Sequence, residues 1–331
     1  MPASNPVMPL PGITDIRAAR QRLGSLAVVT PLIEHPALNE KMGGRILLKA
    51  ETMQRVGAFK FRGAYNAVCQ VDTSKFPGGV VACSSGNHAQ GVAAAATLCG
   101  MASVIVMPSD APRVKLARTK AFGAEVVTYD RATEDRDAIA RRICDQRRAA
   151  FIHPYDDRNV IAGQGTVGLE LMEQAAAVNA TPDAVLVCCS GGGLVTGTAI
   201  AVKAASPSTE VYSVEPAGFD DFARSLKSGK REKNAASTGS ICDALMATSP
   251  GEINFAIAQK TMTGGLVVAD DEVRAARRYA FMELKLVVEP GGAAAFAAIL
   301  AGRIPVRGRT VVAVLSGGNV DPAEYAAIIN A

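Results

Sequence analysis

Short runs of β-branched and other apolar residues recur along the chain, and alanine-rich segments separate them. The runs lie at residues 46–50, 79–83, 103–107, 125–129, 184–188, 211–214 and 310–315. Near-continuous apolar runs of this length, separated by helices, are typical of the strands of parallel sheets that helices cover on both faces. The sequence therefore predicts an α/β fold.

One part of the chain has the pattern of a separate unit. Residues 74–153 contain three strand–helix units of their own, and turn-forming residues bound them at Lys75 to Gly78 and at His153 and Pro154. We therefore predict two domains. Residues 1–73 and 154–331 would form a large domain, and residues 74–153 a small one.

Charge and cysteine usage limit the classes of function. The formal net charge is +4, from 35 basic and 31 acidic residues without a block of one sign, so a nucleic-acid site is not expected. The seven cysteines are odd in number and have no C-x-x-C spacing, which favours free thiols in a reducing compartment. Residues 1–13 do not have the pattern of a signal peptide, and no apolar run approaches the roughly 18 residues of a membrane span. We expect a soluble, cytoplasmic protein.

A lysine stands at a predicted helix start in the stretch Ala-Phe-Lys-Phe-Arg-Gly-Ala, at residues 58–64. An amine in a partly apolar pocket loses its proton more readily and becomes a nucleophile toward an aldehyde. On its own the stretch is a weak signal and is more typical of a solvated surface lysine.

Three glycine-rich stretches each follow a predicted strand, where ligands bind in parallel sheets. Residues 84–91 (Ser-Ser-Gly-Asn-His-Ala-Gln-Gly) open a helix, and this favours either an anion site or an ordinary capped helix start. Residues 190–194 (Ser-Gly-Gly-Gly-Leu) allow the backbone to fold around a phosphate, without the pattern of a nucleotide P-loop. Residues 316–321 (Ser-Gly-Gly-Asn-Val-Asp) place a hydroxyl where it can bond a neutral heteroaromatic nitrogen, although alone they would be an ordinary turn.

In this order and at these intervals, the four stretches closely resemble the β-family, or fold type II, of pyridoxal-phosphate enzymes, whose fold is that of the tryptophan synthase β-chain. The resemblance extends from about Ile16 to Ile329 and is greatest to threonine and serine dehydratases and to serine racemase. It implies that Lys60 forms the Schiff base with the cofactor and that Ser316 faces the pyridine nitrogen.

The resemblance also implies the other functional residues. The implied cofactor-binding residues are Phe59, Lys60, Asn87, Ser190, Gly191, Gly192, Gly193, Leu194 and Ser316. The implied substrate-binding residues are Ser84, Ser85, Asn87, His88 and Arg136. Lys60 and Ser85 would be the catalytic pair, with Ser85 in the place from which serine racemase protonates the second face of its substrate.

A divalent cation is a further implication, because family members bind one beside the phosphate site. Glu215, Asp221 and the Phe219 carbonyl match that segment and suit a hard ion such as Mg²⁺ or Ca²⁺; the alternative is a solvated acidic turn. The chain departs from its relatives at Asp243-Ala244, where they often have Asp-Gly, and this predicts a changed substrate pocket. Only about one helix follows Asn319, so we expect no regulatory domain there.

These observations predict a pyridoxal-phosphate-dependent ammonia-lyase that eliminates water from a small hydroxy amino acid, with L-threonine and L-serine as the expected substrates. The alternatives are an amino acid racemase such as serine racemase, or a catabolic dehydratase for 3-hydroxyaspartate or a hydroxyectoine-derived amino acid. A protein that binds a nucleotide or phosphometabolite without covalent chemistry is the alternative from another class. The expected partners are the amino acid substrate and further copies of the chain, in a homodimer or larger homo-oligomer.

Overall fold

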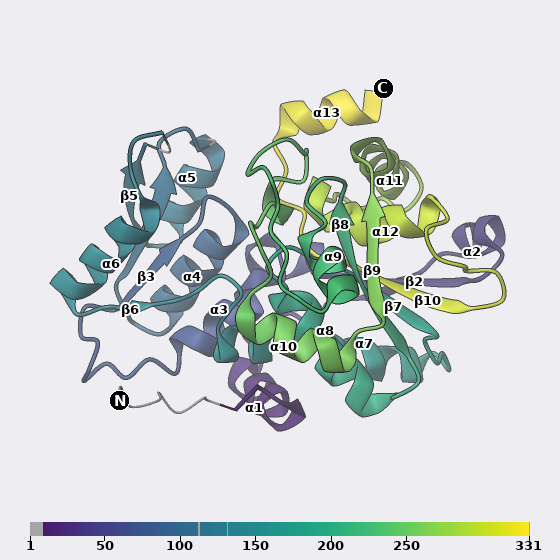
Figure 1. Cartoon of the computed structure of the whole chain (residues 1–331), viewed down its shortest axis with the longest axis horizontal. Coiled ribbons are helices and arrows are strands. Elements are labelled where there is room, and N and C mark those ends of the chain that lie inside the picture. Colours follow the sequence, from purple (N-terminus) through teal and green to yellow (C-terminus); the bar gives the residue numbers. More distant parts are fainter. Residues whose placement is uncertain (1–8, 112, 131, 331) are drawn as a thin grey trace.

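The computed structural model describes residues 9–111, 113–130 and 132–330. The prediction that residues 1–13 are not a signal peptide falls largely on residues 1–8, which lie outside the described residues. The elements form two sheets with their helices, which lie side by side in Figure 1.

The larger sheet has six strands in the order β1-β2-β10-β7-β8-β9. Its strands are β1 (Leu32–Glu34), β2 (Arg45–Ala50), β7 (Ala184–Cys188), β8 (Glu210–Pro216), β9 (Gly264–Val268) and β10 (Thr310–Leu315). Every neighbouring pair is parallel except β1 with β2, which is antiparallel. The predicted parallel sheet is therefore present, with an antiparallel strand added at one edge.

The smaller sheet has four parallel strands in the order β5-β4-β3-β6. Its strands are β3 (Val80–Cys83), β4 (Ser103–Pro108), β5 (Glu125–Tyr129) and β6 (Ala150–Phe151). All four lie within the predicted small domain.

Thirteen α-helices and three 3₁₀ turns connect the strands in the described part of the chain. The helices beside the small sheet are α3 (Lys60–Val68), α4 (Asn87–Leu98), α5 (Arg113–Ala121) and α6 (Arg136–Arg147). The other helices are α1 (Ile13–Leu23), α2 (Pro36–Met42), α7 (Arg158–Ala177), α8 (Gly193–Ala205), α9 (Asp221–Ser228), α10 (Glu252–Thr261), α11 (Asp270–Met282), α12 (Pro290–Leu300) and α13 (Pro322–Asn330). The 3₁₀ turns are η1 (Glu51–Met53), η2 (Arg55–Gly57) and η3 (Asp243–Leu245).

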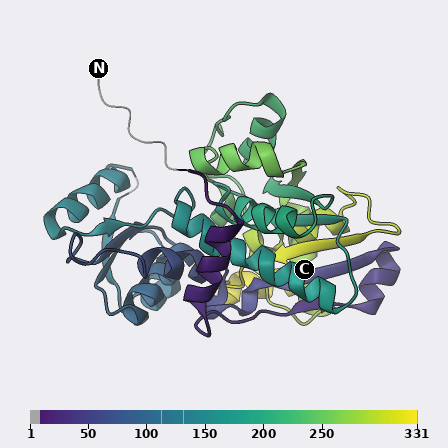
Figure 2. The ribbon, with the colours of Figure 1, turned by 90° about the horizontal axis from the view of Figure 1, so that it is seen from below.

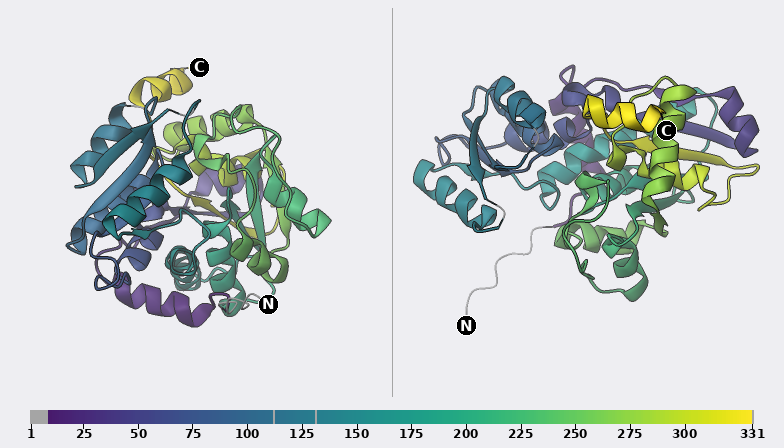
Figure 3. Two further views of the ribbon diagram at one scale, coloured as in Figure 1. Left: turned by 60° about the vertical axis from the view of Figure 1, so that its left-hand side comes forward. Right: turned by 90° about the horizontal axis from the view of Figure 1, so that it is seen from above.

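Helices α1 and α13 lie on opposite sides of the molecule (Figure 3). Seen from below, α1 crosses the region where the two sheets approach each other (Figure 2). There, Ile16 and Ala19 are buried in one apolar cluster with Ala162 of α7 and Ala201 of α8.

Helix α3 connects the two halves of the molecule. Its Ala64, Ala67 and Val68 share an apolar cluster with Val80 of β3 and Val92 of α4, although the predicted boundary assigns α3 to the large domain. The division into two domains, with boundaries at 73/74 and 153/154, stays a prediction.

Two further observations bear on the sequence predictions. All seven cysteines are free thiols, of which Cys83, Cys188, Cys189 and Cys242 are buried. In the described part of the chain, we find no helix that is both long and apolar enough to cross a membrane.

Candidate active site

Lys60 is the first residue of α3 and lies where several loops converge. The 3₁₀ turns η1 and η2 lie between β2 and this helix. The residue as a whole is half-buried, and its Nζ donates a hydrogen bond to the Pro154 carbonyl over 2.7 Å and lies 5.2 Å from the centre of the Phe59 ring. Burial lowers the pKa of Lys60 to about 8, against the opposing effects of Cys188 and Glu289. The amine is therefore more readily neutral than that of an ordinary lysine, as a nucleophile or base requires.

The stretch at 316–321 lies directly against that lysine. The Phe59 N–H donates to the Ser316 carbonyl over 3.0 Å, and Ala58 forms an isolated β-bridge with Gly317. Ser316 itself is buried beside the Cys188 thiol, whose pKa burial raises to about 12 against a hydrogen bond to Ser316. Ser316, directly after β10, and Cys188, the last residue of β7, thus lie close to the start of α3.

The glycine stretch at 190–194 forms a tight turn between β7 and α8. A Cβ atom on Gly191 would lie 2.3 Å from the Tyr155 ring, and one on Gly192 would lie 2.4 Å from the Phe222 ring. Gly192 has φ +103°, which residues with a side chain rarely adopt, and it caps α8 without a side-chain hydrogen bond. The first N–H groups of α8 lack intrahelical acceptors and can therefore bind an anion.

Lys60 and this turn are close to each other through two consecutive residues. Pro154 accepts the hydrogen bond from Lys60, while Tyr155 packs its ring against Gly191. The Lys60 amine and the glycine turn therefore lie close together in one site.

Both the nitrogen and the oxygen of the Asn87 side-chain amide form hydrogen bonds; Asn87 is the first residue of α4. Its Nδ2 donates to Glu289 Oε1 over 2.6 Å, and its Oδ1 accepts from Asn319 Nδ2 over 2.8 Å. Burial raises the pKa of Glu289 to about 7. One N–H of the Asn87 amide remains available to a ligand, because each amide nitrogen carries two.

The predicted substrate residues differ in their surroundings. Ser84 and Ser85 are half-buried between β3 and α4, and Ser84 Oγ accepts a hydrogen bond from the Gly86 N–H over 3.1 Å. His88 instead faces inward: it is 2% exposed, and its Nε2 lies 3.0 Å from the Ile152 carbonyl. Burial lowers the pKa of His88 to about 3, so the ring is neutral.

Arg136 begins α6 and is exposed, with its Nε 3.5 Å from Asp137. Its carbonyl accepts a weak hydrogen bond from the Cys83 thiol, one residue before Ser84. The structure thus brings the backbone of Arg136 to the serine loop, but it shows no contact between the guanidinium group and that loop.

The predicted metal segment lies behind the glycine turn. Both carboxylate oxygens of Glu215 accept backbone hydrogen bonds at the start of α9, from Phe222 and Ala223. Asp221 Oδ1 accepts from Asn234 over 2.5 Å, while its buried Oδ2 has no hydrogen-bond partner. Burial raises the pKa of Asp221 to about 6 and, together with the charge of Asp221, raises that of Glu215.

The side chains of this segment could bind a cation only if a backbone carbonyl oxygen served as a further ligand. Within residues 9–111, 113–130 and 132–330, no three His, Cys, Asp or Glu side chains form a group that could hold a metal ion. The buried, unpaired Asp221 Oδ2 is the feature that a cation would satisfy, with the Phe219 carbonyl as the further oxygen ligand.

Four residues of the site escaped the sequence prediction: Tyr155, Asn254, Glu289 and Asn319. Asn254 Nδ2 donates to the carbonyls of Gly191 and Tyr155, each over 3.0 Å, and so fixes the glycine turn. Asn319 was within a quoted stretch but had no assigned role. The other three lie outside the stretches that the sequence analysis singled out. The Pro-Gly-Gly that follows Glu289 could have indicated that residue, whereas no local pattern indicates Tyr155 or Asn254.

Comparison with known proteins identifies the family. Residues 25–317 match the family model described as "Pyridoxal-phosphate dependent enzyme". The chain is 39% identical to an L-threo-3-hydroxyaspartate ammonia-lyase of Pseudomonas sp, over 97% of this chain and 99% of that protein. It is 36% identical to the serine racemase of Schizosaccharomyces pombe, over 96% of this chain and 97% of that one.

A solved structure supports the same assignment. A threonine deaminase of T.th. superimposes with a TM-score of 0.88 at 43% identity, and the match covers 94% of this chain and 99% of that one. The predicted family and α/β fold are thereby confirmed. The chain belongs to the pyridoxal-phosphate-dependent enzymes of fold type II, in the group that contains threonine dehydratases, hydroxyaspartate ammonia-lyases and serine racemases.

Proposed function

We propose that this protein is an ammonia-lyase that converts a small hydroxy amino acid to a 2-oxo acid and ammonia, with L-threonine and L-serine as substrates. The observation that carries the proposal is the position of Lys60. Its amine, with a pKa of about 8, bonds the Pro154 carbonyl, next to the Tyr155 ring that packs on the glycine turn, and the preceding residue, Phe59, bonds the Ser316 carbonyl.

The residues present fit pyridoxal phosphate. The glycine turn leaves no room for a Cβ at Gly191 or Gly192, so backbone N–H groups can approach a phosphate closely. Lys60 is the amine for the aldehyde, and Asn87 retains a free N–H for the ring oxygen. The Ser316 hydroxyl suits the ring nitrogen, because it bonds that atom without adding a full charge.

The chain's own residues would then divide the work of elimination. When bound, the cofactor supplies an electron sink for the α-carbon of the substrate. Lys60 removes the α-proton, since burial lowers the pKa of its amine to about 8 and so makes the neutral, basic form more accessible than in an ordinary lysine. Ser84, Ser85 and Asn87 hold the substrate carboxylate at the start of α4, where the helix dipole favours an anion.

Two related reactions are the second candidates. The 39% identity to an L-threo-3-hydroxyaspartate ammonia-lyase favours a β-hydroxy dicarboxylic acid as an alternative substrate. The 36% identity to a serine racemase, with a half-buried Ser85 in the serine loop, favours racemisation as a second activity.

The proposal has further parts. A divalent cation, Mg²⁺ or Ca²⁺, would bind Glu215, Asp221 and the Phe219 carbonyl, supported by the unpaired buried Asp221 Oδ2. The seven free thiols support a reducing, cytoplasmic location. A homodimer or larger homo-oligomer stays a prediction from the family resemblance.

A substrate panel tests the proposal. The protein, loaded with pyridoxal phosphate, is assayed for 2-oxo acid with L-threonine, L-serine, L-threo-3-hydroxyaspartate and their D-isomers, and the amino acids that remain are separated by chirality. We expect 2-oxo acid from L-threonine and L-serine at the highest kcat/KM. Turnover of hydroxyaspartate alone would reassign the substrate, and D-amino acid accumulating faster than 2-oxo acid would reassign the reaction.

A further inference from the structure

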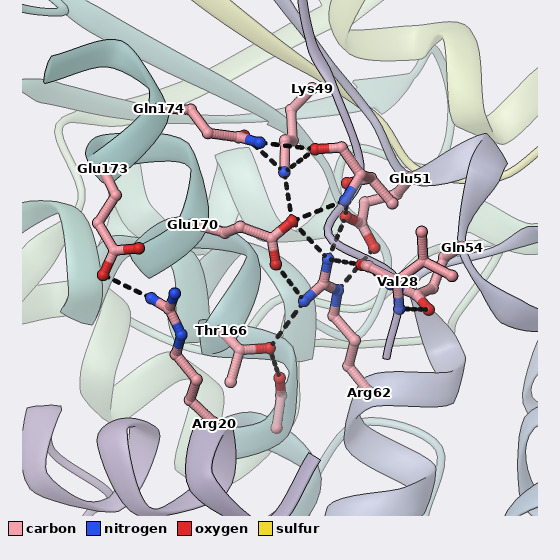
Figure 4. Close-up of polar contacts among 12 residues, drawn as sticks. Arg20, Val28, Lys49, Glu51, Gln54, Arg62, Thr166, Glu170, Glu173 and Gln174 are labelled. Atoms are coloured by element: carbon pink, nitrogen blue, oxygen red, sulfur yellow. Dashed lines mark hydrogen bonds and ion pairs between the residues drawn. The ribbon is translucent and has the colours of Figure 1, made fainter. Parts of the chain in front are cut away.

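A network of four buried charges lies beside the helix that carries Lys60 (Figure 4). It contains Lys49, Glu51, Arg62 and Glu170, all of them 6% exposed or less, so two positive charges face two negative ones. They come from β2, η1, α3 and α7 in that order. The network therefore ties α3 to the large sheet and to α7.

Arg62 is the centre of the network. Its Nε and Nη2 donate to the two oxygens of Glu51, each over 2.8 Å, and its Nη1 donates to Glu170 Oε2 over 2.9 Å. Thr166 and the Val28 carbonyl accept longer hydrogen bonds, each of 3.3 Å. All three guanidinium nitrogens thus have partners, in directions that only a planar, forked group provides.

Lys49 is the second cation of the network, and its hydrogen bonds go to segments other than α3. Its Nζ donates to Glu170 Oε1, Gln174 Oε1 and the Thr30 carbonyl over 2.6 to 2.8 Å. All its bonds reach α7 or the segment before β1. Lys49 therefore has the same burial and charge as Arg62 and shares its partner Glu170, but it is not part of α3 and donates no hydrogen bond to it.

Stability alone is a weak reason for such a network, because apolar residues of similar volume often replace buried ion pairs without loss of stability. Its location suggests another reason. Arg62 stands two residues after Lys60, and residues two apart on a helix point to nearly opposite sides. One side of α3 therefore carries the reactive amine, and the other carries the anchor.

The start of α3 needs an anchor. Phe59, its N-cap residue, provides no side-chain hydrogen bond to the helix, and the first turn of a helix frays most easily. Glycines allow close packing around it: a Cβ on Gly91 would lie 3.2 Å from the Lys60 carbonyl carbon, and one on Gly163 would lie 2.5 Å from the Arg62 oxygen. These contacts limit how far α3 can move, and the bonds from the Phe59 N–H to the Ser316 carbonyl and from the Gly63 N–H to Gln164 Oε1 hold its backbone. The fork of Arg62 adds charge-assisted bonds in fixed directions from a side chain of α3 itself.

We propose that Arg62 is a positioning residue for Lys60: its fork to Glu51 and Glu170 fixes the rotation of the first turn of α3 and so directs the Lys60 amine to the cofactor. This inference rests on the proposed function, because it takes Lys60 as the residue that binds the cofactor aldehyde.

The test follows the covalent link and not turnover. Cofactor-free protein is mixed with pyridoxal phosphate at a series of pH values and quenched with borohydride at set times, and the adduct on the Lys60 peptide is measured by mass spectrometry. The variants are Arg62→Lys, which keeps the charge but loses the fork, and Glu51→Gln, which weakens the fork in nearly the same volume. Lys49→Met is the matched control, because it removes an equally buried cation from the same network.

We expect Arg62→Lys to slow adduct formation on Lys60 about tenfold, because small errors of orientation cost large factors in rate. The pH at which adduct formation on Lys60 is half-maximal should also shift in this variant. Glu51→Gln should change the rate and this pH midpoint in the same directions as Arg62→Lys does. Lys49→Met should lower the melting temperature of the cofactor-free protein while leaving rate and midpoint close to those of the unmodified protein. If Arg62→Lys does not fold, Glu51→Gln decides the matter.

The opposite results are distinct. An unmodified rate and midpoint in both Arg62→Lys and Glu51→Gln would overturn the positioning role, and so would an equal loss in Lys49→Met, since that would mean general destabilisation. Absence of a Lys60 adduct in the unmodified protein would instead refute the proposed function.

Discussion

Replacing Gly192 with alanine tests whether the glycine turn at 190–194 binds the cofactor phosphate, provided that the loss of affinity is compared with the loss of stability. Gly192 has φ +103°, and an added Cβ would lie 2.4 Å from the Phe222 ring and 2.8 Å from Asn254 Cβ. A side chain in a rarely populated backbone region costs about 1 to 3 kcal/mol. Overpacking of this kind costs typically about 1 to 3 kcal/mol more. We therefore expect a loss of about 2 to 6 kcal/mol in the free energy of unfolding.

The clash should also weaken cofactor binding. Asn254 holds the Gly191 carbonyl over 3.0 Å, so displacement of Asn254 shifts the turn that would hold the phosphate. A loss of about 1.4 kcal/mol in binding free energy raises the dissociation constant tenfold. We expect the dissociation constant for pyridoxal phosphate to rise at least tenfold in Gly192→Ala. The assay is titration of cofactor-free protein with pyridoxal phosphate, with thermal unfolding measured in parallel.

Gly302→Ala is the matched control. Gly302 has φ +67°, and an added Cβ would meet no atom within 4 Å. We expect a loss of about 1 to 2 kcal/mol in stability from the left-handed backbone alone and an unchanged affinity for the cofactor. If Gly192→Ala binds pyridoxal phosphate as tightly as Gly302→Ala does, the glycine turn is not the phosphate cradle.

Three further predictions follow from other residues of the site. Ser316→Asp should protonate the ring nitrogen and shift the product ratio away from elimination; an unchanged ratio would place Ser316 elsewhere. Ser85→Ala should abolish racemisation, measured by chiral chromatography, and spare much of the elimination from L-substrates, whereas loss of both reactions would mean that Ser85 mainly holds the substrate. Mg²⁺ or Ca²⁺ should raise the melting temperature by binding the folded state. This effect should fade as the pH falls through about 6, where Asp221 takes up a proton. An equal cation response in Glu215→Ala would contradict the site.

The sequence predicted those parts of the fold that depend on local pattern. The apolar runs that became β3, β4, β7 and β10 are strands because each is buried and parallel to its neighbours. Three strands were not predicted. β1 and β6 have only three and two residues, and β9 begins with two glycines, so their pairing comes from neighbouring strands and not from propensity.

In the candidate site, too, the residues with a local sequence pattern could be predicted and those that depend on distant contacts could not. Lys60 and the glycine turn could be predicted because their residue types serve one kind of chemistry, and the structure brings them together. Tyr155 and Asn254 could not, since their roles arise from contacts with segments far away in the sequence. His88 was assigned to the substrate, but the structure turns its ring inward to the Ile152 carbonyl, which the pattern of a helix start does not reveal.

The most direct test of the account is to find which lysine carries the cofactor. The protein is loaded with pyridoxal phosphate, reduced with borohydride and digested, and the modified peptide is sequenced by mass spectrometry. We predict a pyridoxyl group on Lys60 of the unmodified protein and no such adduct in Lys60→Ala. This variant should stay folded and lose nearly all elimination activity, because the residue that binds the cofactor and the base are removed together. A reduced adduct on another lysine with Lys60 unmodified, or near-normal turnover by Lys60→Ala, would contradict the account.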